Sequence, residues 1–423
     1  MKNTATKPLR IAIIIDDFYP ASGGIARSVQ TQIHELTRLG HKVTLIAPKY
    51  YLERSDDCQT LVVPSFYLPG APSYMCIIGY SRRQVRKINQ KHQFDIVHSQ
   101  TERGALMLAS RLASSQNIPH VHTFHANLAG THESNRFPAF WGSMAYLLLI
   151  NPWLALTSKK RFNDNVVIPK ASSDATSFWA RFDWHSFATI ASRVDAYATP
   201  AKFMQRRIND CSPGFAGKGD IISTGVNPLF SQAIAQTKRS RAIDDQNVRF
   251  LCVSRLSKEK RVCAAVKAFI QANMPNSRLD IVGSGDQLKL LVKLANGHKN
   301  IFFHNHISGI NELAKFYVDA DVFVLPSFRF DTQAITLSEA AVAGLPIIYC
   351  DDRLDVGVDT SNSLLADGPD AESIAKCMRQ LSDKKLRQSM STASTKIAQK
   401  LTPEIMARKY VKLYEQELSS KNK

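Results

Sequence analysis

The chain has 423 residues, 44% of them hydrophobic and 21% charged, and 54 basic against 36 acidic side chains give a formal net charge of +18. This length allows two domains with full cores, and the composition is that of a soluble globular protein. The basic balance favours anionic partners, namely nucleic acid, an anionic membrane surface or phosphorylated substrates. No zinc-finger spacing, recognition-helix arrangement or aromatic RNA-binding strand is present, so a membrane surface fits better than nucleic acid.

The cysteines and the N-terminus indicate the compartment. None of the seven cysteines forms a C-x-x-C pair, and several lie in apolar, strand-like runs. We therefore expect reduced, buried thiols and a cytoplasmic protein. Residues 1–8 lead directly into an apolar strand without the regions of a signal peptide, so export is not expected.

The first half of the chain begins with the pattern of a doubly wound sheet. A strand at Ile11–Ile15 is followed by Gly23 and Gly24, a helix from about Ala26 to Leu39 and a strand at Lys42–Ala47. A glycine pair at such a turn lets the backbone approach a ligand closely, although the pair by itself is weak evidence.

Two segments of the first half contain basic or histidine clusters. The basic side chains of residues 69–91 predict either an ordinary solvated helix face or a cationic face that touches acceptor or lipid phosphate. Strands are predicted at Asp95–His98 and His120–Phe124, and His125 follows the second, where open α/β sheets bind ligands. The neighbouring histidines alternate between strand faces and show no metal spacing, so we predict no metal site.

Residues 139–157 form a run of nineteen without a charge. The run is marginal as a membrane-spanning helix, which leaves a buried helix pair or an interfacial membrane segment. The basic residues 159–161 favour the interface. A loop-rich insertion is predicted at Asp164–Asp183, and Ala191–Pro200 returns to a strand pattern.

The second half repeats the strand–turn–helix logic. A linker is predicted at Ser231–Asn247, followed by a strand at Arg249–Ser254, the cations Arg255 and Lys260, and a helix to about Ala272. Two further strands are predicted at Leu279–Val282, which leads into Gly283, and at Ile301–His304. Arginine offers a planar set of donors and lysine a point charge, a suitable pair for diphosphate oxygens.

The central stretch of the second half runs from residue 321 to residue 349. A buried strand at Val322–Leu325 precedes Asp331, and a helix holding Glu339 ends at Gly344 before a strand at Ile347–Tyr349. Eight residues are a little over two helical turns, so we expect the two carboxylates on roughly one face. Backbone N–H groups at the helix start would point at an anion. A site that binds a diphosphate between two carboxylates, each able to bind hydroxyl groups, fits a nucleotide-sugar as its ligand.

Taken together, these motifs resemble glycosyltransferase family 4. The resemblance rests on Gly23-Gly24, on residues 254–260 and 282–285, and on the Asp331–Glu339 pair followed by residues 343–346. It implies an α/β, GT-B fold with two Rossmann-like doubly wound domains and an interdomain cleft, and sugar transfer from a nucleotide-sugar with retention. Residues 123–125 and 331–335 look most like the diacylglycerol glucosyltransferase and phosphatidylinositol mannosyltransferase branch.

The resemblance also implies a domain plan. Residues 1–228 would form an acceptor-binding domain with an insertion at about 126–190, and residues 229–403 a nucleotide-sugar-binding domain. Residues 404–423 would form a helix that packs back on the N-terminal domain; this tail has an amphipathic pattern.

By position, the resemblance assigns catalytic roles to four residues. Arg255 and Lys260 would stabilise the leaving diphosphate, Asp331 would hold hydroxyls of the transferred sugar, and His125 would lie beside that sugar. Glu339 would bind the ribose hydroxyls. The remaining substrate-binding positions are Gly23, Gly24, Gly283, Thr332, Gln333, Ala334 and Ile335. No metal and no other cofactor is implied.

Two positions depart from the family pattern. The family usually has glutamate where this chain has Asp331, which is one methylene shorter, so the sugar that the site accepts is an open question. It usually has glycine where this chain has Ala334, and a positive φ at an alanine would be strained.

Three functional hypotheses follow. The first is transfer of a hexose from a nucleotide-diphosphate sugar, a UDP-sugar in first place and GDP-mannose as the alternative, to a lipid or lipid-linked acceptor. That enzyme would be peripheral on the cytoplasmic membrane face, with an anionic membrane surface as partner. The second is transfer to a soluble sugar or polysaccharide precursor. The third is a non-catalytic nucleotide-sugar-binding protein, and a GT-B epimerase is a weaker rival.

Overall fold

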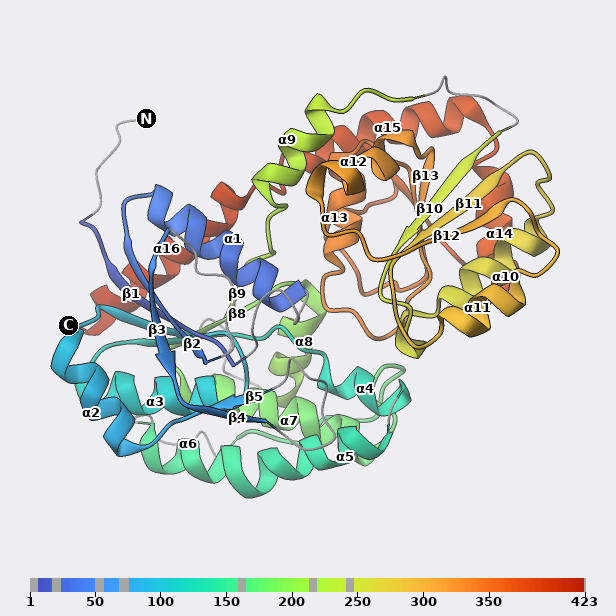
Figure 1. Cartoon of the computed structure of the whole chain (residues 1–423). Coiled ribbons are helices and arrows are strands. Elements are labelled where there is room, and N and C mark those ends of the chain that lie inside the picture. Colours follow the sequence, from blue (N-terminus) through green and yellow to red (C-terminus); the bar gives the residue numbers. More distant parts are fainter. Residues whose placement is uncertain are drawn as a thin grey trace. The chain divides into compact units, whose positions relative to one another are not determined.

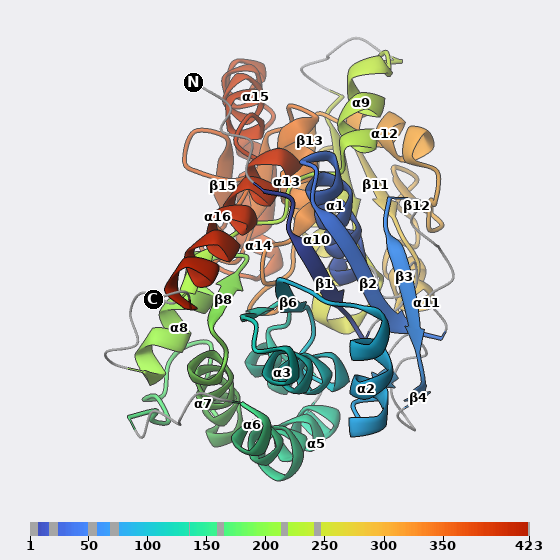
Figure 2. The same cartoon turned by 90° about the vertical axis from the view of Figure 1, so that its left-hand side faces the viewer.

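The computed structural model describes residues 7–16, 24–49, 57–67, 76–134, 136–158, 165–212, 219–240 and 247–421. Its contacts divide the chain into two compact units. Unit 1 comprises Met1–Ser223 together with Pro403–Lys423, and unit 2 comprises Thr224–Thr402. Each unit is a parallel sheet covered by helices on both faces (Figures 1 and 2).

The unit 1 sheet has seven strands in the order β3-β2-β1-β6-β7-β8-β9, all parallel. Their bounds are β1 Arg10–Ile14, β2 Lys42–Pro48, β3 Gln59–Val63, β6 Ile96–Ser99, β7 His120–Thr123, β8 Ala196–Thr199 and β9 Gly219–Ile221. A small antiparallel pair joins β4 (Ser65–Tyr67) to β5 (Cys76–Ile78). The central strands β1, β6, β7 and β8 are almost wholly buried, including the histidine, serine and threonine side chains of β6 and β7.

The helices of unit 1 cover both faces of this sheet. They are α1 Gly24–Arg38, α2 Arg82–Lys91, α3 Gly104–Gln116, α4 Leu128–Ser134, α5 Arg136–Ala145, the π-helix η1 Tyr146–Ile150, α6 Asn151–Thr157, α7 Phe178–Arg193, α8 Lys202–Cys211 and α16 Pro403–Lys421. One face packs α1 and α16 into a single apolar core with the strands. The other face packs α2 and α3 against the strands (Figure 1).

Unit 2 has a six-stranded parallel sheet in the order β12-β11-β10-β13-β14-β15. The strands are β10 Arg249–Val253, β11 Arg278–Val282, β12 Ile301–His304, β13 Val322–Leu325, β14 Ile347–Tyr349 and β15 Ser363–Leu365. The helical elements are α9 Pro228–Gln236, the 3-10 turn η2 Lys258–Lys260, α10 Val262–Ala272, α11 Leu288–Leu294, α12 Ile310–Asp319, α13 Ile335–Val342, α14 Ala371–Gln380 and α15 Lys384–Ala398. Both units are therefore Rossmann-like, as the resemblance predicts.

Three predicted segments have a different structure. The stretch 164–183 is not loop throughout, because α7 begins at Phe178, where the Ser177 hydroxyl accepts a hydrogen bond from the Ala180 amide. Residues 191–193 are the last turn of α7, so the strand predicted from Ala191 begins only at Ala196. The predicted linker, Ser231–Asn247, starts inside α9, a helix that is capped by the Asn227 side chain and buries Phe230.

Candidate functional site

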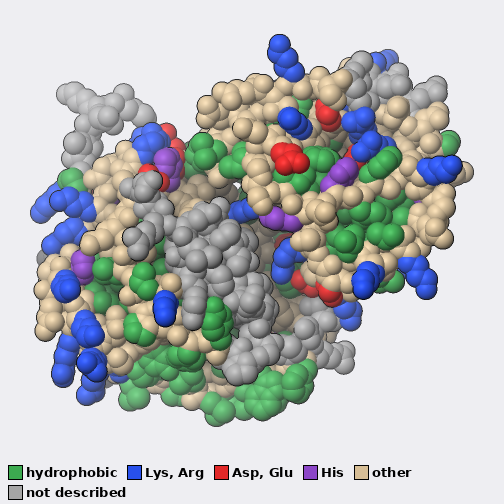
Figure 3. Space-filling view, viewed as in Figure 1, with side chains coloured by type: hydrophobic (Ala, Val, Ile, Leu, Met, Phe, Trp, Pro, Cys, Tyr) green, Lys and Arg blue, Asp and Glu red, His purple; other side chains and the backbone are tan. Residues whose placement is uncertain are grey.

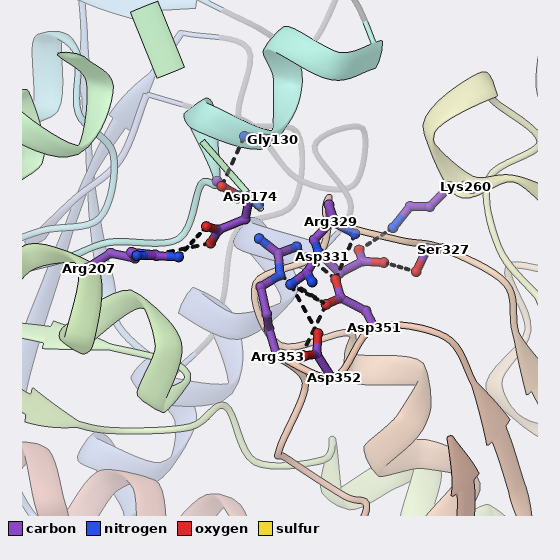
Figure 4. A network of polar contacts seen from close by, with 11 residues as sticks. Gly130, Asp174, Arg207, Lys260, Ser327, Arg329, Asp331, Asp351, Asp352 and Arg353 are labelled. Atoms are coloured by element: carbon purple, nitrogen blue, oxygen red, sulfur yellow. Dashed lines mark hydrogen bonds and ion pairs between the residues drawn. The ribbon is translucent and has the colours of Figure 1, made fainter. Parts of the chain in front are cut away.

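The candidate donor site in unit 2 centres on Asp331, in the loop that follows the buried strand β13. Lys260 forms an ion pair with one oxygen of the Asp331 carboxylate, and the Ser327 hydroxyl donates to the other (Figure 4). Both charged side chains are mostly buried, with 16% of Lys260 and 10% of Asp331 exposed. Burial alone would raise the pKa of Asp331, but the Lys260 ammonium and the two hydrogen bonds outweigh it and hold the pKa below its ordinary value. Asp331 is thus a fixed anion at neutral pH.

Glu339 and Asp331 have different hydrogen-bond partners. Helix α13 begins only at Ile335, so Asp331 precedes the helix and the expected shared helical face does not form. The Glu339 carboxylate accepts a hydrogen bond of 2.7 Å from the Tyr317 hydroxyl, which belongs to α12. The two acids are therefore oriented by different elements.

The two cations after β10 have different surroundings. The side chain of Arg255 is 55% exposed, with its guanidinium 3.3 Å from the Glu259 carboxylate. The Ser257 hydroxyl donates to the same carboxylate at 2.6 Å and orients it. Lys260 ends the 3-10 turn η2 and turns inward to Asp331. Lys260 is therefore paired with the Asp331 carboxylate, whereas Arg255 lies beside Glu259 and stays more than half exposed to solvent.

Gly283 fixes the loop that carries Arg255. A side-chain carbon at Gly283 would lie 1.9 Å from the Ser254 carbonyl oxygen, and the residue has a φ of +149°. Beside it, the Leu256 amide donates to the Ser284 carbonyl at 2.8 Å. The glycine is needed because two backbones meet there, which assigns Gly283 a packing role in addition to the predicted substrate contact.

The segment before α13 has an unusual backbone. Ala334 has φ 54° and ψ 79°, the left-handed conformation that the family's glycine would adopt without strain. The buried Gln333 amide holds this segment by bonding the Thr224 backbone twice, at 2.7 and 2.8 Å. Thr332 is partly buried between Asp331 and Gln333, and Ile335 is the first residue of α13.

A cluster of charges that the sequence analysis did not identify supports the Asp331 loop. Asp351 follows β14, is buried, and accepts hydrogen bonds from the Arg353 guanidinium at 2.9 and 2.7 Å (Figure 4). It also accepts a hydrogen bond of 2.7 Å from the backbone N–H of Arg329, a residue whose own φ is 59°. The signal in the sequence is an acid placed directly after a buried parallel strand.

In unit 1, His125 follows β7 and belongs to a buried hydrogen-bond network. Its Nε2 donates to the Gln100 side-chain oxygen at 2.8 Å, and the Gln100 amide nitrogen donates to Gln32 at 2.9 Å. Gln32 in turn donates to the Tyr414 hydroxyl of α16 at 3.1 Å. Because the Gln100 side-chain oxygen is an acceptor, this contact requires the His125 proton on Nε2.

The pKa of His125 follows from this environment. Burial lowers the pKa to about 4, partly opposed by the carboxylate of Glu102. The imidazole is therefore neutral at physiological pH and carries one proton, on Nε2.

A second group missed in the sequence analysis lies at the same edge of the unit 1 sheet. The buried carboxylate of Asp16, just after β1, accepts hydrogen bonds from the Thr101 hydroxyl and from the backbone of Ile78 and Ala105. Burial raises its pKa to about 6. Asp16 thereby joins β1 to β5 and to the start of α3. Gly24 is the first residue of α1, whereas the predicted site residue Gly23 lies outside the described residues.

Within the described ranges, no group of three or more histidine, cysteine, aspartate or glutamate side chains is arranged to hold a metal ion.

Comparison with known proteins agrees with this arrangement. Residues 22–229 match the model of Glycosyltransferase Family 4, and residues 234–397 match Glycosyl transferases group 1. Alpha-monoglucosyldiacylglycerol synthase of Acholeplasma laidlawii is 27% identical over 366 residues, which cover 83% of each chain. The Streptococcus pneumoniae protein of the same name is 24% identical over 354 residues, 80% of this chain and 70% of that one.

Solved structures share the fold. Sucrose-phosphate synthase from Thermosynechococcus elongatus superposes with a TM-score of 0.68 at 18% identity, covering 97% of this chain and all of that one. The two family models together match most of the chain, and their order is that of the two Rossmann-like units. The chain therefore belongs to glycosyltransferase family 4, as a GT-B hexosyltransferase that acts on nucleotide sugars.

Proposed function

We propose that this protein transfers a hexose, with retention, from a nucleotide-diphosphate sugar to a diacylglycerol-type or lipid-linked acceptor at the cytoplasmic membrane face. A UDP-sugar is the proposed donor, with GDP-mannose as the alternative. The observation that carries the proposal is the anionic Asp331 held between Lys260 and Ser327, with a solvent-facing cation, Arg255, on the same loop as Lys260.

The proposed chemistry follows from these charges. The bond between the anomeric carbon and the diphosphate oxygen breaks, and the electron pair leaves with the diphosphate. Arg255 and Lys260 interact more strongly with that diphosphate as its charge grows, which stabilises the transition state more than the bound donor. The acceptor hydroxyl forms the new bond to the anomeric carbon on the same face, and its proton passes to the departing diphosphate oxygen.

Two side chains would orient the sugar and acceptor. Asp331 accepts hydrogen bonds from sugar hydroxyls, which requires the charged carboxylate that the Lys260 pair maintains. His125 is neutral, so in the role that the resemblance implies it would supply a hydrogen bond to the reacting sugar without adding a positive charge. In this proposal the two cations neutralise the diphosphate without a metal, and chelation with EDTA should leave transfer unchanged.

The lipid acceptor is supported by the relatives and by the surface. Both relatives described above are named as synthases of a glucosyldiacylglycerol, a sugar on a lipid. Exposed apolar side chains on α5, η1 and α6 give unit 1 a surface suited to lipid. A soluble acceptor remains the second candidate, and it would be favoured by transfer to a water-soluble sugar in the absence of lipid.

The donor site is tested by thermal shift of the whole protein against a panel of nucleotide-sugars, since a ligand that binds the folded state raises Tm. We expect one donor class to respond, and Glu339→Ala to weaken its binding by about tenfold or more, because two ribose hydrogen bonds to a charged acceptor are lost. Tyr317→Phe is the matched control, because it removes only the hydroxyl that contacts Glu339.

Equal donor binding by wild type and Glu339→Ala would place the ribose elsewhere. Donor binding without transfer to any acceptor would favour the non-catalytic hypothesis instead.

A further inference from the structure

Unit 1 exposes an apolar surface that its own core does not use. The residues that form it, here called the apolar ridge, are Phe137, Trp141, Leu147, Leu148, Leu149 and Leu156. Leu156 is 85% exposed, Phe137 73%, Leu148 68% and Trp141 58%. Side chains of this size are normally buried, and clustered exposure marks an interaction surface.

The ridge belongs to one continuous helical stretch. By length and composition, residues Ala139–Thr157 are apolar enough to cross a membrane, with a mean hydropathy of 1.3, yet only 28% of that window is buried. Its middle is the π-helix η1, in which three consecutive leucines, Leu147, Leu148 and Leu149, are exposed. This low burial contradicts the buried helix pair, one of the two alternatives left by the sequence, because most of the stretch is not core.

The other side of the same stretch is held firmly by the protein. Tyr146, Ile150 and Leu154 are buried, and the Ser143 hydroxyl donates to the buried Asp183 carboxylate at 2.7 Å. The Trp153 indole donates to the Met107 carbonyl of α3 at 3.1 Å. A spanning orientation would break these contacts and leave buried polar groups unpaired, so the stretch remains attached to unit 1 with only its ridge available.

A cationic surface accompanies the ridge on the same side of the sheet. Helix α2 exposes Arg82, Arg83, Arg86, Lys87 and Lys91. Both α2 and α6 pack against α3, so the two surfaces share one support. Figure 3 shows apolar side chains along the lower margin of unit 1, where Figure 1 places α6, and Lys and Arg side chains toward α2.

We propose that the apolar ridge inserts into the interfacial layer of an anionic bilayer, parallel to its plane, while the α2 cations contact lipid phosphate. Trp, Phe and Leu beside a Lys and Arg cluster is the composition of interfacial membrane helices, and the charge complements anionic headgroups. A second copy of the chain would bring the same cations and no opposite charge. This inference rests on the proposed function, because an enzyme with a lipid acceptor must reach that lipid in the membrane.

The test is flotation of the full-length protein with vesicles of phosphatidylcholine containing about one third phosphatidylglycerol, a composition chosen to supply anionic headgroups. We expect a salt-sensitive component from α2 and a salt-resistant component from the ridge. The variant Trp141→Ser, Leu148→Ser, Leu156→Ser should lower the partition coefficient about a hundredfold at high salt, because three large apolar groups no longer leave water. Brominated lipid should quench wild-type tryptophan fluorescence, and Trp141→Phe should remove most of that quenching.

A matched control removes as many exposed apolar groups away from the ridge. Leu229→Ser, Leu290→Ser, Val292→Ser in unit 2 should change partitioning less than about twofold, because these side chains lie outside the ridge. The variant Arg83→Gln, Lys87→Gln should weaken binding at low salt only. Flotation of the ridge variant equal to wild type would overturn the inference, as would a dimer in sedimentation without lipid that the ridge variant separates into monomers.

Transfer assays separate this inference from the proposed function. In detergent micelles containing diacylglycerol, the ridge variant should transfer hexose at the wild-type rate, because no site residue is changed. If wild type transfers in micelles but does not float with vesicles, only the ridge inference fails. If wild type floats with vesicles but transfers to no lipid in micelles, the proposed acceptor is wrong and the ridge inference stands.

Discussion

Lys260 and Arg255 carry the same charge on one loop, but the protein uses them differently. Lys260 is mostly buried against Asp331, whereas Arg255 is more than half exposed. Lys260→Ala should therefore lower kcat/KM by about 10³ and stability by roughly 3 kcal/mol, because a mostly buried carboxylate loses its cation and keeps only the Ser327 hydrogen bond. Arg255→Ala should lower kcat/KM by about 10² and change stability by less than about 0.5 kcal/mol.

Steady-state kinetics and urea denaturation measure both effects, and the double variant should be inactive but folded. Full activity in the double variant would show that the diphosphate site is misplaced.

Ala334 has a positive φ and is therefore strained. The sequence analysis predicted this strain for a positive φ, because the family usually has glycine at this position. The left-handed conformation costs an alanine about 1–2 kcal/mol, and glycine avoids this cost. Glycine in turn loses about 0.5–1 kcal/mol more conformational entropy on folding, which offsets part of the gain. Ala334→Gly should therefore stabilise the protein by roughly 0.5–1 kcal/mol in chemical denaturation.

Ala340→Gly, in the middle of the same helix α13, is the control and should destabilise by about 2 kcal/mol, because it loses helix propensity and a buried methyl group. A loss of stability in Ala334→Gly would contradict the left-handed assignment.

The lowered pKa of His125 predicts a specific pH dependence. A histidine whose folded pKa lies below the unfolded value contributes stability that is full above about 6.5 and is lost as pH falls toward the folded pKa of about 4. Nitrogen NMR of the ring should show a neutral imidazole with the proton on Nε2 at pH 5.5. His125→Asn, which retains a donor to Gln100, should make stability less pH-dependent between pH 6.5 and 4. A His125 titration midpoint near 6.5 would disprove the buried neutral assignment.

At the scale of elements, α16 is the clearest example of a distant segment that completes a network. Its Tyr414 accepts a hydrogen bond from Gln32 and lies 2.6 Å from His98 Nδ1, inside the core that α16 shares with α1. Tyr414→Phe should cost about 1–2 kcal/mol, because a buried donor loses its partner. Denaturation midpoints of the two proteins measure the cost, and equal midpoints would show that the hydroxyl is not structurally important.

The elements that could be predicted were those with a strong local pattern. The strands at residues 301–304, 322–325 and 347–349 have the predicted bounds because each begins with a short apolar run, and the last two are wholly buried. Helix α7 was not predicted, because residues 178–183 mix aromatic and charged side chains, and only packing in three dimensions shows which of them face inward. The helical relation of Asp331 to Glu339 was wrong because the first turn begins four residues after Asp331.

At the scale of the whole molecule, two α/β units follow from the two strand–turn–helix patterns, and the family from the order of the motifs. The residues that support the candidate site could not be predicted from these patterns. Asp16, Gln100 and Asp351 each lie just after a buried strand. Each has a partner far along the chain, namely the Ile78 amide for Asp16, Gln32 for Gln100 and the Arg329 amide for Asp351. Local patterns carry no record of such pairings.

The central claim is retaining transfer of a hexose from a nucleotide-sugar to a lipid. The most direct measurement is to incubate the protein with ¹³C-labelled UDP-glucose and, separately, labelled GDP-mannose, each with diacylglycerol in detergent, and to read the product's anomeric linkage by NMR. The account predicts a labelled glycolipid from one donor, with the α linkage of that donor retained, and no product from Arg255→Ala, Lys260→Ala. A β linkage, or label found only in water-soluble products, would contradict it.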